Sequence, residues 1–95
     1  MSAYLIVNVD VKNAAAYEEY KAKVPALIGK HGGEYAARGG ECIVIEGNWR
    51  PKRMVLLRFP DLAAVKRFLA DPEYQPLIEL RRRVAESEIV AVEGI

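Results

Sequence analysis

Apolar residues recur along this chain with two different periods, and the order in which the period changes restricts the fold more than any other feature. Residues 3–11 alternate between purely apolar and mixed positions, which is the pattern of a β-strand whose two faces differ. Residues 14–31 follow helical spacing instead, after Asn13 as a suitable N-cap and before the glycine pair at 32–33, which suits a helix end. Strand-type residues return in 34–47 and 53–59, so the first half of the chain predicts strand, helix, strand and strand.

The second half of the chain adds helical segments and a last strand. Pro60 and Asp61 end the strand and cap a helix over 62–70, and the Asp71-Pro72 pair ends that helix. Pro76 suits the first turn of a further helix over 76–85, and residues 88–93 read as the final strand. The order βαββαβ predicts an α+β fold, the ferredoxin-like plait, with a four-stranded antiparallel sheet in the order 4-1-3-2. At 95 residues we expect one domain spanning 1–95.

The faces of this sheet predict an assembly. We expect residues 42–47 to pair with 53–58 across a turn at 48–52, with a bulge at Gly39-Gly40. The helices can cover only one face of the sheet, which leaves apolar side chains on the other in water, more than a soluble monomer usually exposes. These side chains are Tyr4, Ile6, Val44, Met54, Leu56 and Ile89. The pattern therefore predicts a homodimer that buries this face, because a chain this short gains from additional burial.

Charge and cysteine content exclude several classes of partner. The formal net charge is +1, from 14 basic and 13 acidic residues, so no overall field attracts nucleic acid or a membrane. The run Arg81-Arg82-Arg83 is interpreted as a solvated face, since acidic residues stand four positions away. Cys42, the single cysteine, lies in an apolar run, which favours a buried core position and the reducing cytoplasm. The first residues favour a strand over a signal peptide, and one histidine with one cysteine makes no metal site.

Six short segments, in order, resemble one known family. They are HGGEY, RGG, IEGNWRPKR, RFPD, DPEYQPL and VEG, and the resemblance covers nearly the whole chain. In this respect the chain is similar to the family called domain of unknown function 1330, within the dimeric α/β-barrel superfamily. The resemblance implies a dimer in which two plaits join sheet to sheet as a barrel. The wider superfamily includes cofactor-free monooxygenases of polycyclic aromatics, muconolactone isomerases and haem enzymes, which is analogy at the level of the fold.

His31 is the only histidine, and it is the first candidate for a catalytic base. Helical phase places it on the same stripe as Tyr17 and Tyr20, where it would take a proton from a phenol or an enol. Tyr20 or Tyr17 would then hydrogen-bond the oxygen of the substrate. The alternative is a partly exposed histidine whose cation suits the C-terminus of the helix.

Arg38, Arg53 and Trp49 are the candidates for substrate binding. Arg38 precedes two glycines, so it suits a clamp on a carboxylate or phenolate, and Arg53 is expected to share the same anion. The alternatives are a solvated arginine at a sheet edge and an exposed strand start. Trp49 is interpreted as a lid over a ligand or, alternatively, as an aromatic cover on a hairpin turn.

These residues support two hypotheses of different classes. The first is a cofactor-independent enzyme, similar to a monooxygenase or an isomerase, acting on a small aromatic or enolisable acid. The second is a non-catalytic module that binds a small ligand in the same pocket. In both hypotheses we expect no cofactor, a small anionic or aromatic ligand and a homodimer. Whether His31 faces a closed cavity beside Tyr17 and Tyr20 distinguishes the two.

Overall fold

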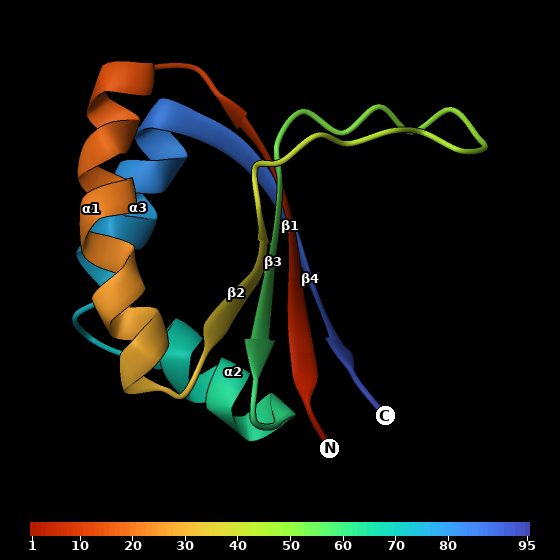
Figure 1. Cartoon of the computed structure of the whole chain (residues 1–95). Coiled ribbons are helices and arrows are strands. Elements are labelled where there is room, and N and C mark those ends of the chain that lie inside the picture. The colour runs from red at the N-terminus through yellow and green to blue at the C-terminus, as the bar shows by residue number, and fades with distance from the viewer.

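The computed structural model describes residues 1–95 and shows the expected order of elements (Figure 1). The strands are β1 (Ala3–Val11), β2 (Glu34–Arg38), β3 (Met54–Phe59) and β4 (Ala85–Glu93), and the helices are α1 (Ala14–Lys30), α2 (Leu62–Ala70) and α3 (Gln75–Val84). The strands form one antiparallel sheet in the order β2-β3-β1-β4. This is the predicted ferredoxin-like plait, since the order is 4-1-3-2 when it is counted from the other edge.

The helix starts lie where the sequence predicts them. The side chain of Asn13 accepts a hydrogen bond from the Ala16 N–H at 3.1 Å, and that of Asp61 accepts one from the Ala64 N–H at 2.8 Å. Each of these bonds satisfies a backbone donor that has no partner within the helix. None of the three helices is both long enough and apolar enough to cross a membrane.

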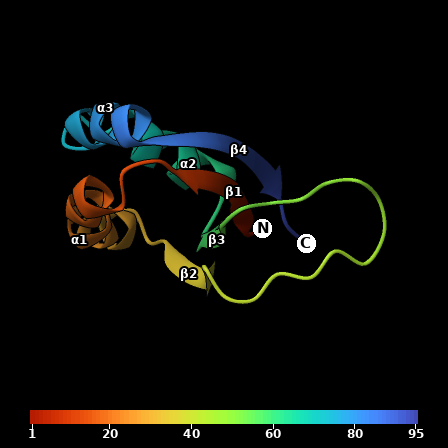
Figure 2. The ribbon, with the colours of Figure 1, turned by 90° about the horizontal axis from the view of Figure 1, so that it is seen from above.

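All three helices cover the same face of the sheet, as Figures 1 and 2 show from two directions. Leu5, Val9 and Leu57 point from the sheet into this helix-covered layer and are almost completely buried there. Ile6 and Leu56 lie directly opposite each other on adjacent strands and point to the other face, where they are only partly buried. We call this second face the open face of the sheet.

The second strand is shorter than predicted, and the predicted pairing of 42–47 with 53–58 is wrong. β2 ends at Arg38 and pairs with β3 so that Tyr35 lies opposite Leu57 and Arg38 lies opposite Val55. The bulge lies between Tyr35 and Ala37 rather than at Gly39-Gly40. After it, residues 39–53 leave the sheet as a long extended loop (Figure 1). Strand propensity expresses how well a side chain fits a pleated surface, and the protomer offers residues 42–47 no neighbouring strand.

Several side chains lie away from their predicted positions. Cys42, expected in the core, is exposed on the loop, and Val44 leaves the open face with it. Ile89 lies opposite Val7 on the helix-covered side, and β4 instead presents Val90 and Val92 on the open face. The open face remains apolar, but its composition differs from the prediction.

Candidate functional site

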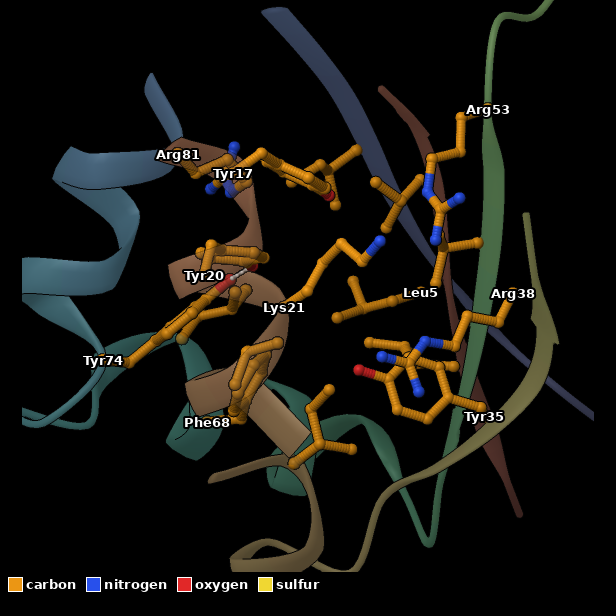
Figure 3. A pocket seen from close by; sticks show the side chains of 17 residues that line it. Leu5, Tyr17, Tyr20, Lys21, Tyr35, Arg38, Arg53, Phe68, Tyr74 and Arg81 are labelled. Carbon is orange, nitrogen blue, oxygen red and sulfur yellow. Dashed lines mark hydrogen bonds between the residues drawn. The ribbon is translucent and has the colours of Figure 1, made fainter. Parts of the chain in front are cut away.

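A cavity of about 50 Å³ lies between the helices and the helix-covered face of the sheet (Figure 3). Of the 17 residues that line it, 13 are hydrophobic, so most of its wall offers no hydrogen bond to a ligand. They are Leu5, Val7, Tyr17, Tyr20, Lys21, Val24, Ile28, Tyr35, Arg38, Arg53, Val55, Leu57, Phe68, Leu69, Tyr74, Arg81 and Ile89. Every strand and every helix contributes to the wall, so the complete fold is needed to form the site.

The charged side chains of the wall are all basic. Lys21, Arg38, Arg53 and Arg81 line the cavity, and no carboxylate does. In Figure 3, Lys21 from α1 and Arg53 from the sheet side extend their charged ends into the same space. Charges of one sign gathered around a low-dielectric space repel one another, and an anion relieves that repulsion. The electrostatics of the cavity therefore favour a negatively charged ligand.

Arg81 is the most deeply buried of these cations. It projects from α3, and only 8% of its surface is exposed. It forms no ion pair with any acidic residue, and its buried Nε atom has no hydrogen-bond partner. Buried charges are normally paired, because an unpaired charge in the interior is costly. An anionic group of a ligand would therefore gain the most interaction energy beside Arg81.

The guanidinium of Arg53 packs against Gly39, the residue that follows β2. Gly39 has a φ of +68°, which turns the chain out of the sheet, and its N–H donates to the Met54 carbonyl at 2.8 Å. A Cβ atom on Gly39 would clash with the guanidinium of Arg53. The Nε of Arg53 is buried and, like that of Arg81, has no partner. Gly39 thus leaves room for the guanidinium group of Arg53.

Arg38 and Lys21 lie toward the more accessible side of the cavity. The guanidinium carbon of Arg38 lies 4.5 Å from the centre of the Tyr35 ring, within the range of a cation–π contact. Lys21 forms an exposed ion pair with Glu18 at 3.1 Å, and about a third of the lysine side chain is exposed. Exposed ion pairs and exposed cation–π contacts are both weak, so neither contact prevents these side chains from moving aside when a ligand enters.

Tyrosines and a phenylalanine form the helix-side wall. The Tyr17 and Tyr20 rings stack with centroids 5.5 Å apart, and Phe68 stacks on Tyr74 at 4.3 Å. The hydroxyl oxygens of Tyr20 and Tyr74 are 2.7 Å apart, within hydrogen-bond distance. This wall offers flat apolar surfaces and hydroxyl groups to a ligand, which suits an aromatic ring.

Burial keeps the hydroxyl groups of Tyr17 and Tyr20 neutral. Burial raises the pKa of Tyr17, and the charges of Arg53 and Arg81 oppose the rise. Burial also raises the pKa of Tyr20, and the neighbouring Tyr74 adds to the effect. Arginine is always protonated. The tyrosine and arginine groups of the wall therefore donate hydrogen bonds and offer no base near neutral pH.

His31 lies outside this cavity. It caps the C-terminus of α1, with its Nε2 atom 2.8 Å from the Oδ2 atom of Asp71, while Lys30 Nζ lies 2.9 Å from the same oxygen. Its ring lies against Phe68, with centroids 6.1 Å apart, so it supports the wall from behind. The hydrogen bond from His31, followed by that from Lys30, holds the pKa of Asp71 far below its usual range. The contacts of His31 are those of a residue that fastens the end of α1 to the segment before α3.

The structure brings together four of the six candidate residues. Tyr17, Tyr20, Arg38 and Arg53 all line the cavity, whereas His31 lies behind the wall. Trp49 lies on the extended loop with 58% of its surface exposed, also outside the cavity lining.

Sequence reasoning missed Lys21, Tyr35, Tyr74 and Arg81. For Arg81 a signal was present, because it shares its helical phase with Leu77, Leu80 and Val84, all of them buried. No group of three or more His, Cys, Asp or Glu side chains is placed to hold a metal ion.

Comparisons with known proteins confirm the resemblance stated from the sequence. A family model described as "Domain of unknown function (DUF1330)" matches residues 2–95. No curated protein matches the chain in sequence.

Solved structures share the fold at low sequence identity. The RPA0582 protein of unknown function from Rhodopseudomonas palustris is 17% identical with a TM-score of 0.79, over 99% of this chain and 82% of that one. SnoaB, a cofactor-independent oxygenase from Streptomyces nogalater, is 18% identical with a TM-score of 0.69, over 99% and 93%. A dimeric ferredoxin-like protein of unknown function from Jannaschia sp. CCS1 is 15% identical with a TM-score of 0.72, over 99% and 100%. At these identities the likeness shows the fold alone.

Proposed function

We propose that this chain, which belongs to the family described as domain of unknown function 1330, binds a small and largely apolar anion between its helices and its sheet. The observation that carries the proposal is the buried and unpaired guanidinium of Arg81 in a wall with further cations and no carboxylate. The free-energy cost of burying these cations is offset only when an anion binds beside them.

The chemistry of the wall narrows the class of ligand. The stacked faces of Tyr17, Tyr20 and Phe68 favour a flat, apolar body, and the guanidinium groups favour a carboxylate or an ionised phenol or enol. In this proposal Arg53 and Arg81 hold the anionic oxygen and the Tyr17 hydroxyl donates to it. Arg38 and Lys21 attract the ligand and move aside as it enters. The cavity of about 50 Å³ is smaller than the roughly 150 Å³ that holds one benzene ring, so a single ring or a short chain fits only once Arg38 and Lys21 have moved aside.

A panel of matched small molecules tests this proposal. Benzoate carries the expected charge and ring, benzamide is its neutral counterpart of nearly equal shape, and benzylamine reverses the charge. Thermal unfolding is measured at increasing concentrations of each, because a ligand that binds the folded state raises the unfolding temperature. We expect benzoate to raise it, with benzamide and benzylamine giving no comparable shift. Equal shifts from benzoate and benzamide would show that the cations do not select the ligand.

A second function, catalysis without a cofactor, is supported by the same cations. A phenol or enol bound beside Arg53 and Arg81 is more acidic than in water, because the positive charges favour its ionised form. Since no histidine or carboxylate lines the cavity, the proton goes to solvent and the cations hold the enolate or phenolate. Such an anion is the reactive form for oxygenation or isomerisation, and SnoaB, with the same fold, is described as a cofactor-independent oxygenase. We assign His31 no step in this chemistry, since it is bonded to Asp71 outside the cavity.

Enolisation of a simple keto acid separates catalysis from binding. Levulinate has a carboxylate and an exchangeable C–H next to its ketone, so its exchange with deuterium in heavy water reports enolate formation by NMR. An enzyme of this class accelerates the exchange, and Arg53→Gln slows it. A module that only binds raises the unfolding temperature with benzoate but leaves the exchange rate unchanged.

We also propose that the chain acts as a homodimer joined through the open face of the sheet, giving the barrel-like dimer of its superfamily. Two observations support this proposal: the open face carries Ile6, Leu56, Val90 and Val92, and one protein of the same fold is described as dimeric. We place the dimer in the cytoplasm, where a free and exposed thiol such as that of Cys42 stays reduced.

A further inference from the structure

The loop between β2 and β3 has the residue composition of a strand but does not pair with any strand of the sheet. Residues 40–52, which we call the arm, make no hydrogen bond between backbone groups, whereas the chain as a whole makes 57. The middle of the arm reads ECIVIE, a run of the residue types that are enriched in paired strands. The middle of the arm therefore has the composition of a strand but no backbone partner.

The side chains of the arm are apolar and exposed. Ile43, Ile45 and Trp49 expose 69%, 84% and 58% of their surfaces, and all three lie within this one loop. Scattered apolar residues on a surface are ordinary, but a group of large ones on a projecting loop marks a contact surface. A buried tryptophan alone removes about 150–250 Å² from water, so docking of the arm has a substantial driving force.

The direction of the arm indicates where its partner lies. In Figures 1 and 2 it projects from the β2–β3 end of the sheet to the side opposite the helices, which is the side of the open face. That face carries exposed Val90 and Val92 on β4, and Ile6 and Leu56 beside them. Each leg of the arm, about six residues long, reaches about 20 Å when extended, which is enough to cross a neighbouring sheet.

We propose that the arm of each protomer docks on a second copy of this chain, with Ile43, Ile45 and Trp49 packed against the partner. A second copy fits better than another protein because the arm and the open face lie on one side of the molecule and both are apolar. A two-fold axis then covers both surfaces of both protomers at once, since such an interface uses the same patch twice. This inference rests on the proposed sheet-face dimer and extends it by a pair of exchanged arms.

The arm also connects the partner to the cavity. Its two ends adjoin Arg38–Gly39 on one side and Arg53 on the other, and both arginines line the cavity. A partner that holds the arm therefore fixes the backbone from which two of the four cations project. Through this connection, docking of the arm on the partner restrains the site, so binding of the anion and of the partner favour each other.

Sedimentation of an arm variant tests the proposal. In Ile43→Asp/Ile45→Asp, two exposed apolar side chains become charged, and the fold of the protomer is retained because neither is buried in it. We expect the dimer dissociation constant to rise more than about 100-fold while far-ultraviolet circular dichroism is unchanged. The control, Ala15→Asp/Ala63→Asp, adds the same charge at exposed positions of α1 and α2 and leaves the dimer intact.

Fluorescence of Trp49, the single tryptophan, gives a second and independent readout. As the wild-type concentration rises through the dimer range, its emission moves to shorter wavelength if the arm becomes buried. A wild-type dimer whose stability and tryptophan emission are both insensitive to the arm overturns this inference and leaves the sheet-face dimer standing. A wild-type chain that is monomeric at all accessible concentrations overturns both.

Discussion

At the scale of single residues, the cations that form no ion pair define the candidate site. Seven ion pairs form in the protomer, but neither Arg81 nor Arg53 takes part in any of them. Sequence reasoning identified Arg53 as a partner of Arg38 at an anionic pocket, with an exposed strand start as the alternative. It placed the whole run of three arginines, Arg81 included, on a solvated face because acidic residues stand four positions from Arg82 and Arg83. Helical phase separates the buried Arg81 from its exposed neighbours Arg82 and Arg83.

Replacing Arg81 by an apolar residue should stabilise the protein. Arg81→Leu removes a buried and unpaired charge and fills the same space with an apolar side chain, as in other buried sites where this exchange is favourable. We expect the free energy of unfolding to rise by about 1–3 kcal/mol in chemical denaturation. Arg82→Leu, at an exposed position on the next residue, should change it by less than about 0.5 kcal/mol. A loss of stability in Arg81→Leu would mean that the guanidinium has a structural partner.

The contact between His31 and Asp71 predicts a dependence of stability on pH. The pKa of Asp71 is lowered in the folded state by hydrogen bonds from His31 and Lys30. A carboxyl of this kind contributes stability above its unfolded pKa, about 3.9, and this contribution is lost as the pH falls through and below that value. Denaturation curves measured from pH 6 down to pH 3 should show the loss in the wild type and a flatter profile in Asp71→Asn. Glu73→Gln, at an exposed partner of Lys30, should keep the wild-type profile, and identical profiles for all three would refute the assignment.

At the scale of elements, the sequence predicts helix caps better than it predicts which strands pair. The caps at Asn13 and Asp61 and the helix after them depend on neighbouring residues only, and the structure confirms them. The pairing of β2 with β3 depends on residues far apart in the chain. Apolar residues 42–45 suggested a hairpin within the protomer, whereas the actual β2 is Glu34–Arg38, a weaker strand sequence held by β3. A strand-like segment with no partner in its own protomer cannot be distinguished from a paired strand by composition.

Gly39 and Gly40 test how the end of β2 shapes the site. Gly39→Ala places a side chain at a positive φ and against the guanidinium of Arg53, so we expect about 1–2 kcal/mol of destabilisation. Displacement of Arg53 should also weaken benzoate binding about tenfold, measured by titration calorimetry. Gly40→Ala is the matched control, because a Cβ atom there meets nothing within 4 Å. Equal effects of the two variants would show that the turn, and not the position of Arg53, determines binding.

At the scale of the whole molecule, one protomer leaves two apolar surfaces uncovered, the open face and the arm. The sequence predicted an exposed apolar face because apolar and polar residues do not alternate cleanly along the strands. This inference needed only the two-residue period of side chains in a β-strand. It misassigned two members of that face: Val44 through the incorrect pairing of 42–47, and Ile89 because β4 pairs with β1 so that Ile89 lies opposite Val7. The cavity itself was not predictable in detail, since its wall draws on every element of the fold.

A charge on the open face should prevent association. Leu56 lies on β3 opposite Ile6, in the middle of this face, and it is only partly buried in the protomer. Leu56→Lys places an unpaired cation in the proposed interface. The free energy of association should therefore become less favourable by about 1–3 kcal/mol per protomer. Sedimentation velocity should show a shift from dimer to monomer. Lys66→Leu, on the helix-covered side of the molecule, is expected to sediment as the wild type does.

The central claim is that a cation-lined cavity selects an anion, and calorimetric titration of benzoate into matched variants tests it most directly. Wild type and Arg82→Gln should bind benzoate with equal affinity, since Arg82 is exposed outside the cavity. Arg81→Gln keeps a polar side chain of similar length but loses the charge, and a charge-assisted contact contributes about 1.5–3 kcal/mol. The affinity of Arg81→Gln for benzoate should therefore fall about 10- to 150-fold, with benzamide binding weakly to all three proteins. Benzoate binding that is unchanged in Arg81→Gln, or that is absent from the wild type, would contradict the claim.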